Sequence, residues 1–319
     1  MSAYTRSVLV TGGTTGVGFY AAADIARQRP DYCVVIASRK DTAHSAMAIN
    51  RKLRQSNVRF LPLDLGDLKN VRSFAESWGK KEFPPIAVLL LNAGLSFPAE
   101  IHHTTDGFEA TFGVNHVGHA LLFHLLQPYL ADEARIVVTA SGTHDPAQKS
   151  GMPDARYTSA EELAHPAGKA LTIDGRERYS TSKLCNILWT YALARRLKQL
   201  PEKKWTVVAF DPGFMPGTGL AREYGAVFRF IWTWVMPALI PLMRLLISSN
   251  IHKPEESGAS LAYTALEEKE TNGVYYEGRK QIKSSVASYD EAKQEDLWAW
   301  TVKTLAADEQ ERHRFEIVA

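Results

Sequence analysis

Short, uninterrupted runs of Val, Ile and Leu alternate with helix-like segments through the first two thirds of the chain. The runs read SVLVTG, YCVVIAS, VRFLPLDL, IAVLLLNAG, ARIVVTASG and WTVVAFDPG. Because they lack the in–out alternation of a half-exposed strand, both of their faces must be covered by other elements. Strand–helix repetition of this kind predicts an α/β fold, a doubly wound parallel sheet with helices on both faces.

The predicted elements make up a single Rossmann-type domain over residues 1–319, with about seven strands if GVYYEG near the end is counted. Helices are expected at 17–28, 43–53, 68–78 and 107–130, and one more carries RYSTSKLCN before the sixth strand. Residues 143–175 are polar and broken by Pro and Gly, which predicts an inserted loop.

Composition narrows the partners and the compartment. A formal net charge of +2, without any block of like charges, argues against nucleic-acid binding. Cys33 and Cys185 both lie in segments expected to be regular structure, so a disulfide framework is not predicted. We therefore predict a reducing, cytoplasmic location. The N-terminus enters a strand at once, which leaves no room for a signal peptide.

A glycine-rich turn, TGGTTGVG, follows the first strand and opens the first helix. Three glycines at this spacing permit a tight turn, close approach of a pyrophosphate and close helix packing. The free amides and the positive end of the helix dipole favour phosphate. We therefore predict that a dinucleotide contacts Gly12, Thr14, Thr15, Gly16, Val17 and Gly18.

The ends of the next strands refine this prediction. Ser38 and Arg39 stand where an NAD-binding chain carries a carboxylate, and Arg39 can pair with a 2′-phosphate, so NADP (NADPH) is favoured over a plain surface arginine. Asp64, with Leu65 beside it, is placed to accept a hydrogen bond from the adenine amino group; the alternative for Asp64 is a helix N-cap. The small residues of the fourth strand's end let the backbone approach the cofactor: Asn92, Ala93 and Gly94.

Tyr179 and Lys183 are four residues apart and share one helix face. That spacing alone does not distinguish an active-site pair from an ordinary amphipathic helix. Six motifs nevertheless occur in the order found in the short-chain dehydrogenases/reductases, and the chain resembles that family over roughly residues 5–220: TGGTTGVG, NAG, GVNHVGH, a serine after the fifth strand, YSTSK and DPG. The resemblance implies a catalytic tetrad of Asn115, Ser141, Tyr179 and Lys183. It also implies that Pro212, Gly213 and Thr218 lie against the nicotinamide.

The chemistry of carbonyl reduction agrees with those roles. Reduction adds a hydride to carbon and a proton to oxygen, and Tyr179 is the expected proton donor. A free phenol has a pKa near 10, so we expect the Lys183 ammonium and the oxidised nicotinamide to lower the pKa of Tyr179. Ser141 would donate a hydrogen bond to the developing oxyanion. The resemblance assigns Asn115 to a water that links the lysine to solvent.

Longer stretches resemble the branch that holds retinol dehydrogenase-like enzymes and protochlorophyllide reductases, which use NADP and take large apolar substrates. Phe214 stands where the protochlorophyllide enzymes carry a cysteine, so light-driven pigment reduction is not expected. The resemblance implies a bulky apolar substrate with a carbonyl or alcohol: a steroid, retinoid or polycyclic natural product. Reduction of a C=C or C=N bond, and a non-catalytic NADP-binding scaffold or sensor, stay open. Members are usually homo-dimers or tetramers.

Residues 226–246, AVFRFIWTWVMPALIPLMRLL, are unusually apolar. The charge-free centre, Phe230–Met243, is shorter than the roughly 20 residues of a spanning helix and contains two prolines. A buried helix, a flap over an apolar ligand and contact with a membrane surface are the three interpretations; the resemblance favours a substrate flap over residues 220–255. No metal is predicted, because His116, His119 and His124 lack a carboxylate or cysteine beside them and are better explained by packing or capping.

Overall fold

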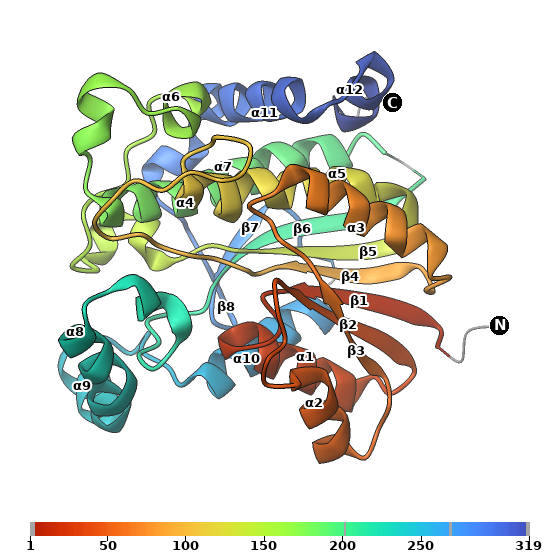
Figure 1. Cartoon of the computed structure of the whole chain (residues 1–319), viewed down its shortest axis with the longest axis horizontal. Helices are drawn as coiled ribbons and strands as arrows, with labels where there is room; N and C mark the ends of the chain where they lie inside the picture. The colour runs from red at the N-terminus through yellow and green to blue at the C-terminus, as the bar shows by residue number, and fades with distance from the viewer. Residues whose placement is uncertain (1–3, 201, 268–269, 317–319) are drawn as a thin grey trace.

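The structure is a computed structural model and describes residues 4–200, 202–267 and 270–316. Its described strands form one twisted sheet in the order β3-β2-β1-β4-β5-β6-β7-β8, which runs through the middle of the molecule (Figure 1). The strands are β1 Arg6–Thr11, β2 Tyr32–Ser38, β3 Val58–Pro62, β4 Ile86–Leu91, β5 Leu130–Thr139, β6 Lys204–Asp211, β7 Val274–Glu277 and β8 Lys280–Ile282. All neighbours pair in parallel except β7 and β8.

The doubly wound sheet predicted from the apolar runs is therefore confirmed. The short β8 was not expected, because Lys280–Ile282 is largely exposed and carries no apolar run; it pairs only after the chain reverses at Gly278, which has a positive φ. The strand order reverses between β1 and β4. At such a reversal the carboxyl ends of the strands border a crevice in which ligands bind.

Helices cover both faces of the sheet, with α3, α5 and α7 on one side and α1, α2 and α10 on the other (Figure 1). Neighbouring strand residues point to opposite faces, so Leu9, Leu89 and Ile136 join one apolar core while Val8, Leu90 and Val137 join the other. The helices are α1 Gly16–Gln28, α2 Ser45–Leu53, α3 Leu68–Lys80, α4 Ala110–Phe112, α5 Gly118–Leu126, α6 Ala160–Ala164, α7 Gly175–Leu197, α8 Ala226–Phe230, α9 Ile240–Leu246, α10 Pro254–Leu266, α11 Glu291–Leu305 and α12 Glu309–Glu316.

The helix predicted at 107–130 is not one regular α-helix. It begins at Ala110, and Gly113–Val117 forms a π-helical turn between α4 and α5. The amide of Gly118 donates to the carbonyl of Gly113, five residues back, which inserts an extra residue into the turn. Such turns are rare and are frequently found at functional sites. Asn115 lies in the middle of this one.

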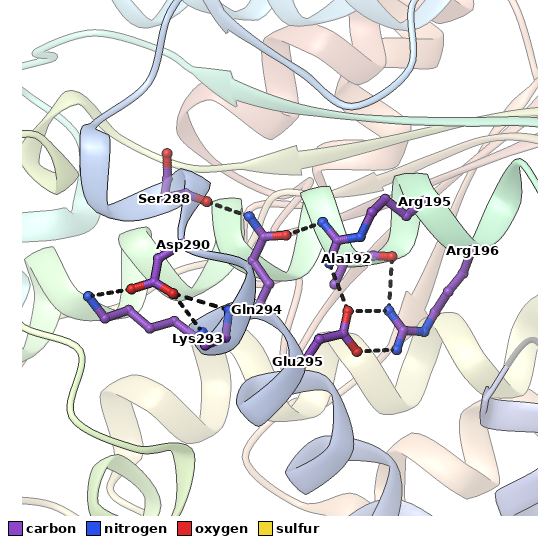
Figure 2. A network of polar contacts seen from close by, with 9 residues as sticks. Ala192, Arg195, Arg196, Ser288, Asp290, Lys293, Gln294 and Glu295 are labelled. Atoms are coloured by element: carbon purple, nitrogen blue, oxygen red, sulfur yellow. Dashed lines mark hydrogen bonds and ion pairs between the residues drawn. The ribbon is translucent and has the colours of Figure 1, made fainter.

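Helix α7 is held in place by the C-terminal part of the chain. Arg195 and Arg196 both form ion pairs with Glu295 of α11, at 2.7 and 2.6 Å, and Figure 2 shows this network between the two helices. Exposed ion pairs of this kind contribute about 0–1 kcal/mol each. The larger contribution comes from buried Trp189 of α7, which stacks on Trp298 of α11. Helix α11 thus fixes the helix that carries Tyr179 and Lys183.

Residues 143–175, predicted as an inserted loop, are ordered by contacts with other elements. The Tyr157 hydroxyl and the Ala160 amide both donate to the Asp296 carboxylate of α11, at 2.6 and 3.0 Å. Together with α4 and the start of α7, the segment encloses a cavity of about 380 Å³, which Glu109, Arg178 and Ser182 help to line. The segment therefore covers the N-terminal half of α7.

The chain leaves β6 and forms a helical excursion, α8 to α9, at one corner of the molecule (Figure 1). We call residues 226–247 the apolar lobe. The buried-helix interpretation is wrong, because among residues 226–246 only Trp232 and Ile240 are buried. Trp234 is 71% exposed and Leu245 is 81% exposed. Ala226–Leu246 is also the one segment of the described chain that is long and apolar enough to cross a membrane, by length and composition alone.

Candidate active site

Tyr179 and Lys183 are both buried on one face of α7. The Lys183 Nζ donates to the carbonyl of Thr139, the last residue of β5, at 3.1 Å. The same nitrogen lies 5.6 Å from the centre of the Tyr179 ring. The helical spacing predicted from the sequence therefore places the phenol and the ammonium side by side at the carboxyl edge of the sheet.

Asn115 meets the lysine from the other side. Its Oδ1 accepts from the Leu95 amide at 2.9 Å, and its Nδ2 donates to the Leu95 carbonyl and to Ser182 Oγ, each at 3.0 Å. Gly94 lies between the two polar groups: a Cβ there would be 3.4 Å from Lys183 Nζ and 3.5 Å from Asn115 Oδ1. A methyl group at position 94 would be in van der Waals contact with both groups, and a longer side chain would have to displace them.

Ser141 follows β5, and its backbone carbonyl is bound by a histidine that sequence reasoning missed. The Nδ1 of buried His144 lies 2.7 Å from the Ser141 carbonyl, and its Nε2 accepts from the Ser285 amide at 3.0 Å. A carbonyl can only accept, so Nδ1 carries the proton and Nε2 is bare. In the sequence the only signal was a histidine three residues after Ser141. Its partner Ser285 lies far along the chain.

The pKa of Tyr179 in the protein without cofactor differs from the expected direction. Burial, and then the nearby charge of Asp211, raise the pKa of Tyr179, while the Ser141 hydroxyl opposes that rise by hydrogen bonding. The chain by itself therefore does not produce the predicted lowering, which also included the charge of the oxidised nicotinamide, and the buried phenol keeps its proton. Burial also lowers the pKa of Lys183 to about 8, against the opposing effect of Asp211.

Asp211 is a second group that the motif reading passed over. The side chain is buried at the end of β6, where Oδ1 accepts from the Gly213 amide at 2.9 Å and Oδ2 accepts from Asn250 Nδ2 at 3.0 Å. The DPG motif was noted only for its Pro and Gly. The structure places its carboxylate within electrostatic reach of both Tyr179 and Lys183.

The glycine-rich turn fits a pyrophosphate. Cβ atoms would lie 2.9 Å from Ala93 Cα at Gly12 and 2.5 Å from the Gly12 carbonyl at Gly18, so only glycine fits at either position. Gly16 faces open space, and Thr15, the N-cap of α1, makes no side-chain cap. The first amides of α1 are thus left for an anion. Thr14 and Val17 belong to the same turn and first helical turn.

At the second and third strands the predicted residues have different surroundings. Thr14 Oγ1 donates to Ser38 Oγ at 3.1 Å, while Arg39 is exposed and forms no hydrogen bond or ion pair within the described residues. Asp64 is not a helix N-cap: its Oδ1 accepts from the Gly66 amide at 2.9 Å. Helix α3 is capped by Asp67 instead.

The loop after β6 is tied to the apolar lobe. The Pro212 carbonyl accepts from Ser257 Oγ at 2.6 Å, and Gly213 adopts a positive φ of 78°. The Thr218 carbonyl accepts from the Trp232 indole at 2.8 Å, and the Trp232 ring also packs edge-on against Phe214. The structure thus connects the residues expected at the nicotinamide to the lobe through one buried tryptophan.

Comparison with known proteins gives a consistent result. Residues 6–159 match the short chain dehydrogenase family, a match that ends before Tyr179. The chloroplast protochlorophyllide reductase of Daucus carota is 30% identical over 94% of this chain and 78% of its own length. Retinol dehydrogenase 13 of Homo sapiens is 30% identical over 95% of this chain and 85% of its own length. A crystal structure of an uncharacterised Mycobacterium paratuberculosis protein has a TM-score of 0.68 at 25% identity, covering 95% of this chain and 94% of that one.

The buried environment of Lys183 predicts a titration that can be measured directly. In the ligand-free protein, ¹³C NMR of the lysine Cε should place the pKa of Lys183 at about 8, below the ordinary 10.5. Asp211→Asn should lower the pKa of Lys183 further, because the negative charge that favours the ammonium is removed. Asp145→Asn, on the same edge of the molecule, is the control and should leave it unchanged. A pKa at the ordinary value would show that the ammonium is hydrated.

Proposed function

We propose that this chain, which belongs to the short-chain dehydrogenase/reductase family in its retinol dehydrogenase/protochlorophyllide reductase-like branch, is an NADP-dependent oxidoreductase. It transfers a hydride between the nicotinamide and the carbonyl or alcohol of a bulky apolar substrate. The observation that carries the proposal is the convergence of a phenol, an ammonium, an amide and a hydroxyl at the carboxyl edge of the sheet: buried Tyr179, Lys183 and Asn115, and half-buried Ser141.

The residues of the site divide the work of carbonyl reduction. Bound NADPH supplies the hydride. Tyr179, which burial keeps protonated, donates its proton to the substrate oxygen, and the Ser141 hydroxyl donates a hydrogen bond to the same oxygen. The Lys183 ammonium, protonated below a pKa of about 8, stabilises the phenolate that remains. Asn115 holds the hydrogen-bonded turn beside the lysine.

Replacement of Tyr179 tests the reaction. Tyr179→Phe removes the proton donor and keeps the ring, so turnover of a panel of ketones should fall by about 10²- to 10⁴-fold, the usual contribution of a general acid. NADPH binding, followed by fluorescence titration, should not change. Tyr191→Phe is the matched control: Tyr191 is a buried tyrosine of the same helix whose hydroxyl bonds to Ser284, away from the site. Undiminished turnover in Tyr179→Phe would refute the assignment.

The cofactor is NADP in this proposal because Arg39 is exposed at the end of β2 and has no partner in the described chain. A guanidinium in that position is available for the 2′-phosphate, which NAD lacks. The neighbouring Ser38 places no negative charge there. Asp64, Leu65 and the Asn92–Gly94 turn would line the adenine and ribose side of the same crevice.

Replacement of Arg39 separates the two dinucleotides. A charge-assisted hydrogen bond contributes about 1.5–3 kcal/mol, so Arg39→Ala should weaken NADPH binding by roughly 10- to 150-fold. NADH binding should stay the same, because it does not use the phosphate contact. Lys40→Ala, an exposed cation one residue on, is the control. Equal losses for both dinucleotides in Arg39→Ala would contradict the choice of NADP.

The apolar lobe supports a large apolar substrate and a place for the reaction. It is connected through Trp232 to the loop 212–219 expected at the nicotinamide, so it can cover a substrate there. Its outer side chains are exposed, and Arg222 and Arg229 lie among or beside them. An exposed apolar surface with basic neighbours fits the headgroup region of an anionic membrane. We place the protein in the cytoplasm with this lobe against a membrane surface.

Liposome flotation tests the membrane contact. The full chain should float with vesicles that contain anionic lipid, and Trp234→Glu combined with Leu245→Glu should abolish flotation because two charges enter the apolar surface. Val286→Glu is the control, since Val286 is 91% exposed but lies outside the lobe. Failure of the wild type to float would reject the contact. Self-association of the wild type that the double variant loses, by light scattering, would instead assign the lobe to a second copy of the chain.

A further inference from the structure

His119, on α5, makes two polar contacts that packing alone does not require. The ring is buried, with Nδ1 3.1 Å from the carbonyl of Asn115, one turn earlier, and Nε2 2.9 Å from Thr11 Oγ1. Thr11 is the last residue of β1, directly before the glycine-rich turn. One imidazole therefore spans the distance between the turn that carries Asn115 and the strand that leads into the predicted phosphate site.

The partners define which ring nitrogen carries the proton. A carbonyl oxygen can only accept, so the contact with Asn115 requires a proton on Nδ1. Burial, with a smaller effect from the charge of Lys183, lowers the pKa of His119 to about 4, so the ring is neutral near pH 7. Nε2 is then bare and accepts from the Thr11 hydroxyl.

The Thr11 hydroxyl donates a hydrogen bond to His119, and its oxygen also accepts two hydrogen bonds. The amides of Asn92 and Ala93 donate to it at 2.8 and 3.0 Å. A competing acceptor for the hydroxyl, the Leu90 carbonyl, is further away at 3.2 Å. The result is a chain of hydrogen bonds with one direction: from the Asn92 and Ala93 amides to Thr11, to His119 and to the Asn115 carbonyl.

A glycine explains why the histidine can reach β1. A Cβ at Gly118 would collide with the carbonyl of Leu65, so α5 packs directly against the turn after β3. Gly118 also ends the π-helical turn that contains Asn115. The residue after it, His119, is thereby held between β1 and the π-helical turn.

We propose that His119 is a positioning residue of the active site: through its Nδ1–H and bare Nε2 it fixes the Asn115 turn relative to the Asn92–Gly94 loop. This rests on the proposed function, in which Asn115 and Lys183 act together. A Cβ at Gly94 would lie 3.4 Å from Lys183 Nζ and 3.5 Å from Asn115 Oδ1, so the two groups face the same glycine. A shift of the π-helical turn would therefore change the spacing between the amide and the ammonium. Thr11 acts with His119 as the second half of the connection.

The first measurement is spectroscopic and needs no turnover. In protein labelled with ¹⁵N-histidine, at pH 7 and without cofactor, His119 should show a protonated Nδ1 and a bare Nε2. Thr11→Val, which keeps the shape of the side chain and removes the hydroxyl, should shift the Nε2 resonance; Thr11→Ser should restore it. A proton on Nε2 of His119 in the wild type would overturn the proposal.

The second measurement is kinetic. His119→Phe and Thr11→Val should lower kcat for ketone reduction by about 10- to 100-fold, since displacements of about 1 Å have effects of that size. The Kd for NADPH should stay the same, because the amides of α1 hold the phosphates. Thr11→Ser should recover kcat. The control is His124→Phe, a buried histidine of the same helix that stacks on Phe315 and has no contact with the site; it should change thermal stability and not kcat.

The outcomes separate the two proposals. If Tyr179→Phe is inactive while His119→Phe and Thr11→Val turn over like the wild type, only the positioning role is wrong. If Tyr179→Phe remains active, the proposed reaction is wrong, and the histidine spectrum still decides whether the hydrogen-bond chain exists. A loss of kcat in Thr11→Ser equal to that in Thr11→Val would also overturn the proposal, because a lost methyl group and not a lost hydroxyl would then be responsible.

Discussion

A buried ammonium determines how the active site is built. Removing a charge from water costs several kcal/mol unless partners replace the solvent, and Lys183 has a carbonyl at the end of β5 and the carboxylate of Asp211 in electrostatic reach. Both partners lie at the carboxyl ends of neighbouring strands, so the sheet itself supplies them. The bare backbone of Gly94 and the π-helical turn of Asn115 complete the enclosure. The phenol of Tyr179 is adjacent because one helix carries both.

The sequence was sufficient for features that depend on local pattern. Continuous apolar runs predicted six strands and their parallel pairing, and GVYYEG was counted as a seventh. Motif order predicted which side chains would converge near Lys183. Features that depend on distant partners were missed. The orientation of His144 depends on a hydrogen bond from the distant Ser285 amide. The role of Asp211 depends on its charge lying near Lys183 of α7. The raised pKa of Tyr179 in the chain without cofactor was not predicted, because burial depends on the surrounding tertiary structure, which residue types alone do not reveal.

The C-terminal part of the chain is as much a component of the site as the nucleotide-binding half. Burial lowers the pKa of two histidines, and each contacts a backbone carbonyl of the candidate site: His119 that of Asn115 and His144 that of Ser141. One of them is anchored in β1 and the other in the segment before α11. The candidate site is therefore held by residues from both ends of the sequence, including a segment beyond residue 159, where the family match stops.

The attachment of the apolar lobe has a thermodynamic consequence. Between residues 226 and 246 the lobe buries only Trp232 and Ile240. One indole hydrogen bond joins it to the loop before it, and Arg244 joins it to the Ile251 carbonyl and the Glu256 carboxylate after it. These few contacts are small beside the burial in the two main cores, since a buried apolar side chain contributes about 1.5–3 kcal/mol and a hydrogen bond about 1 kcal/mol. The two apolar cores on either side of the sheet contain neither side chain. Local opening of this corner is thus energetically separate from global unfolding, and the lobe can move while the sheet stays intact.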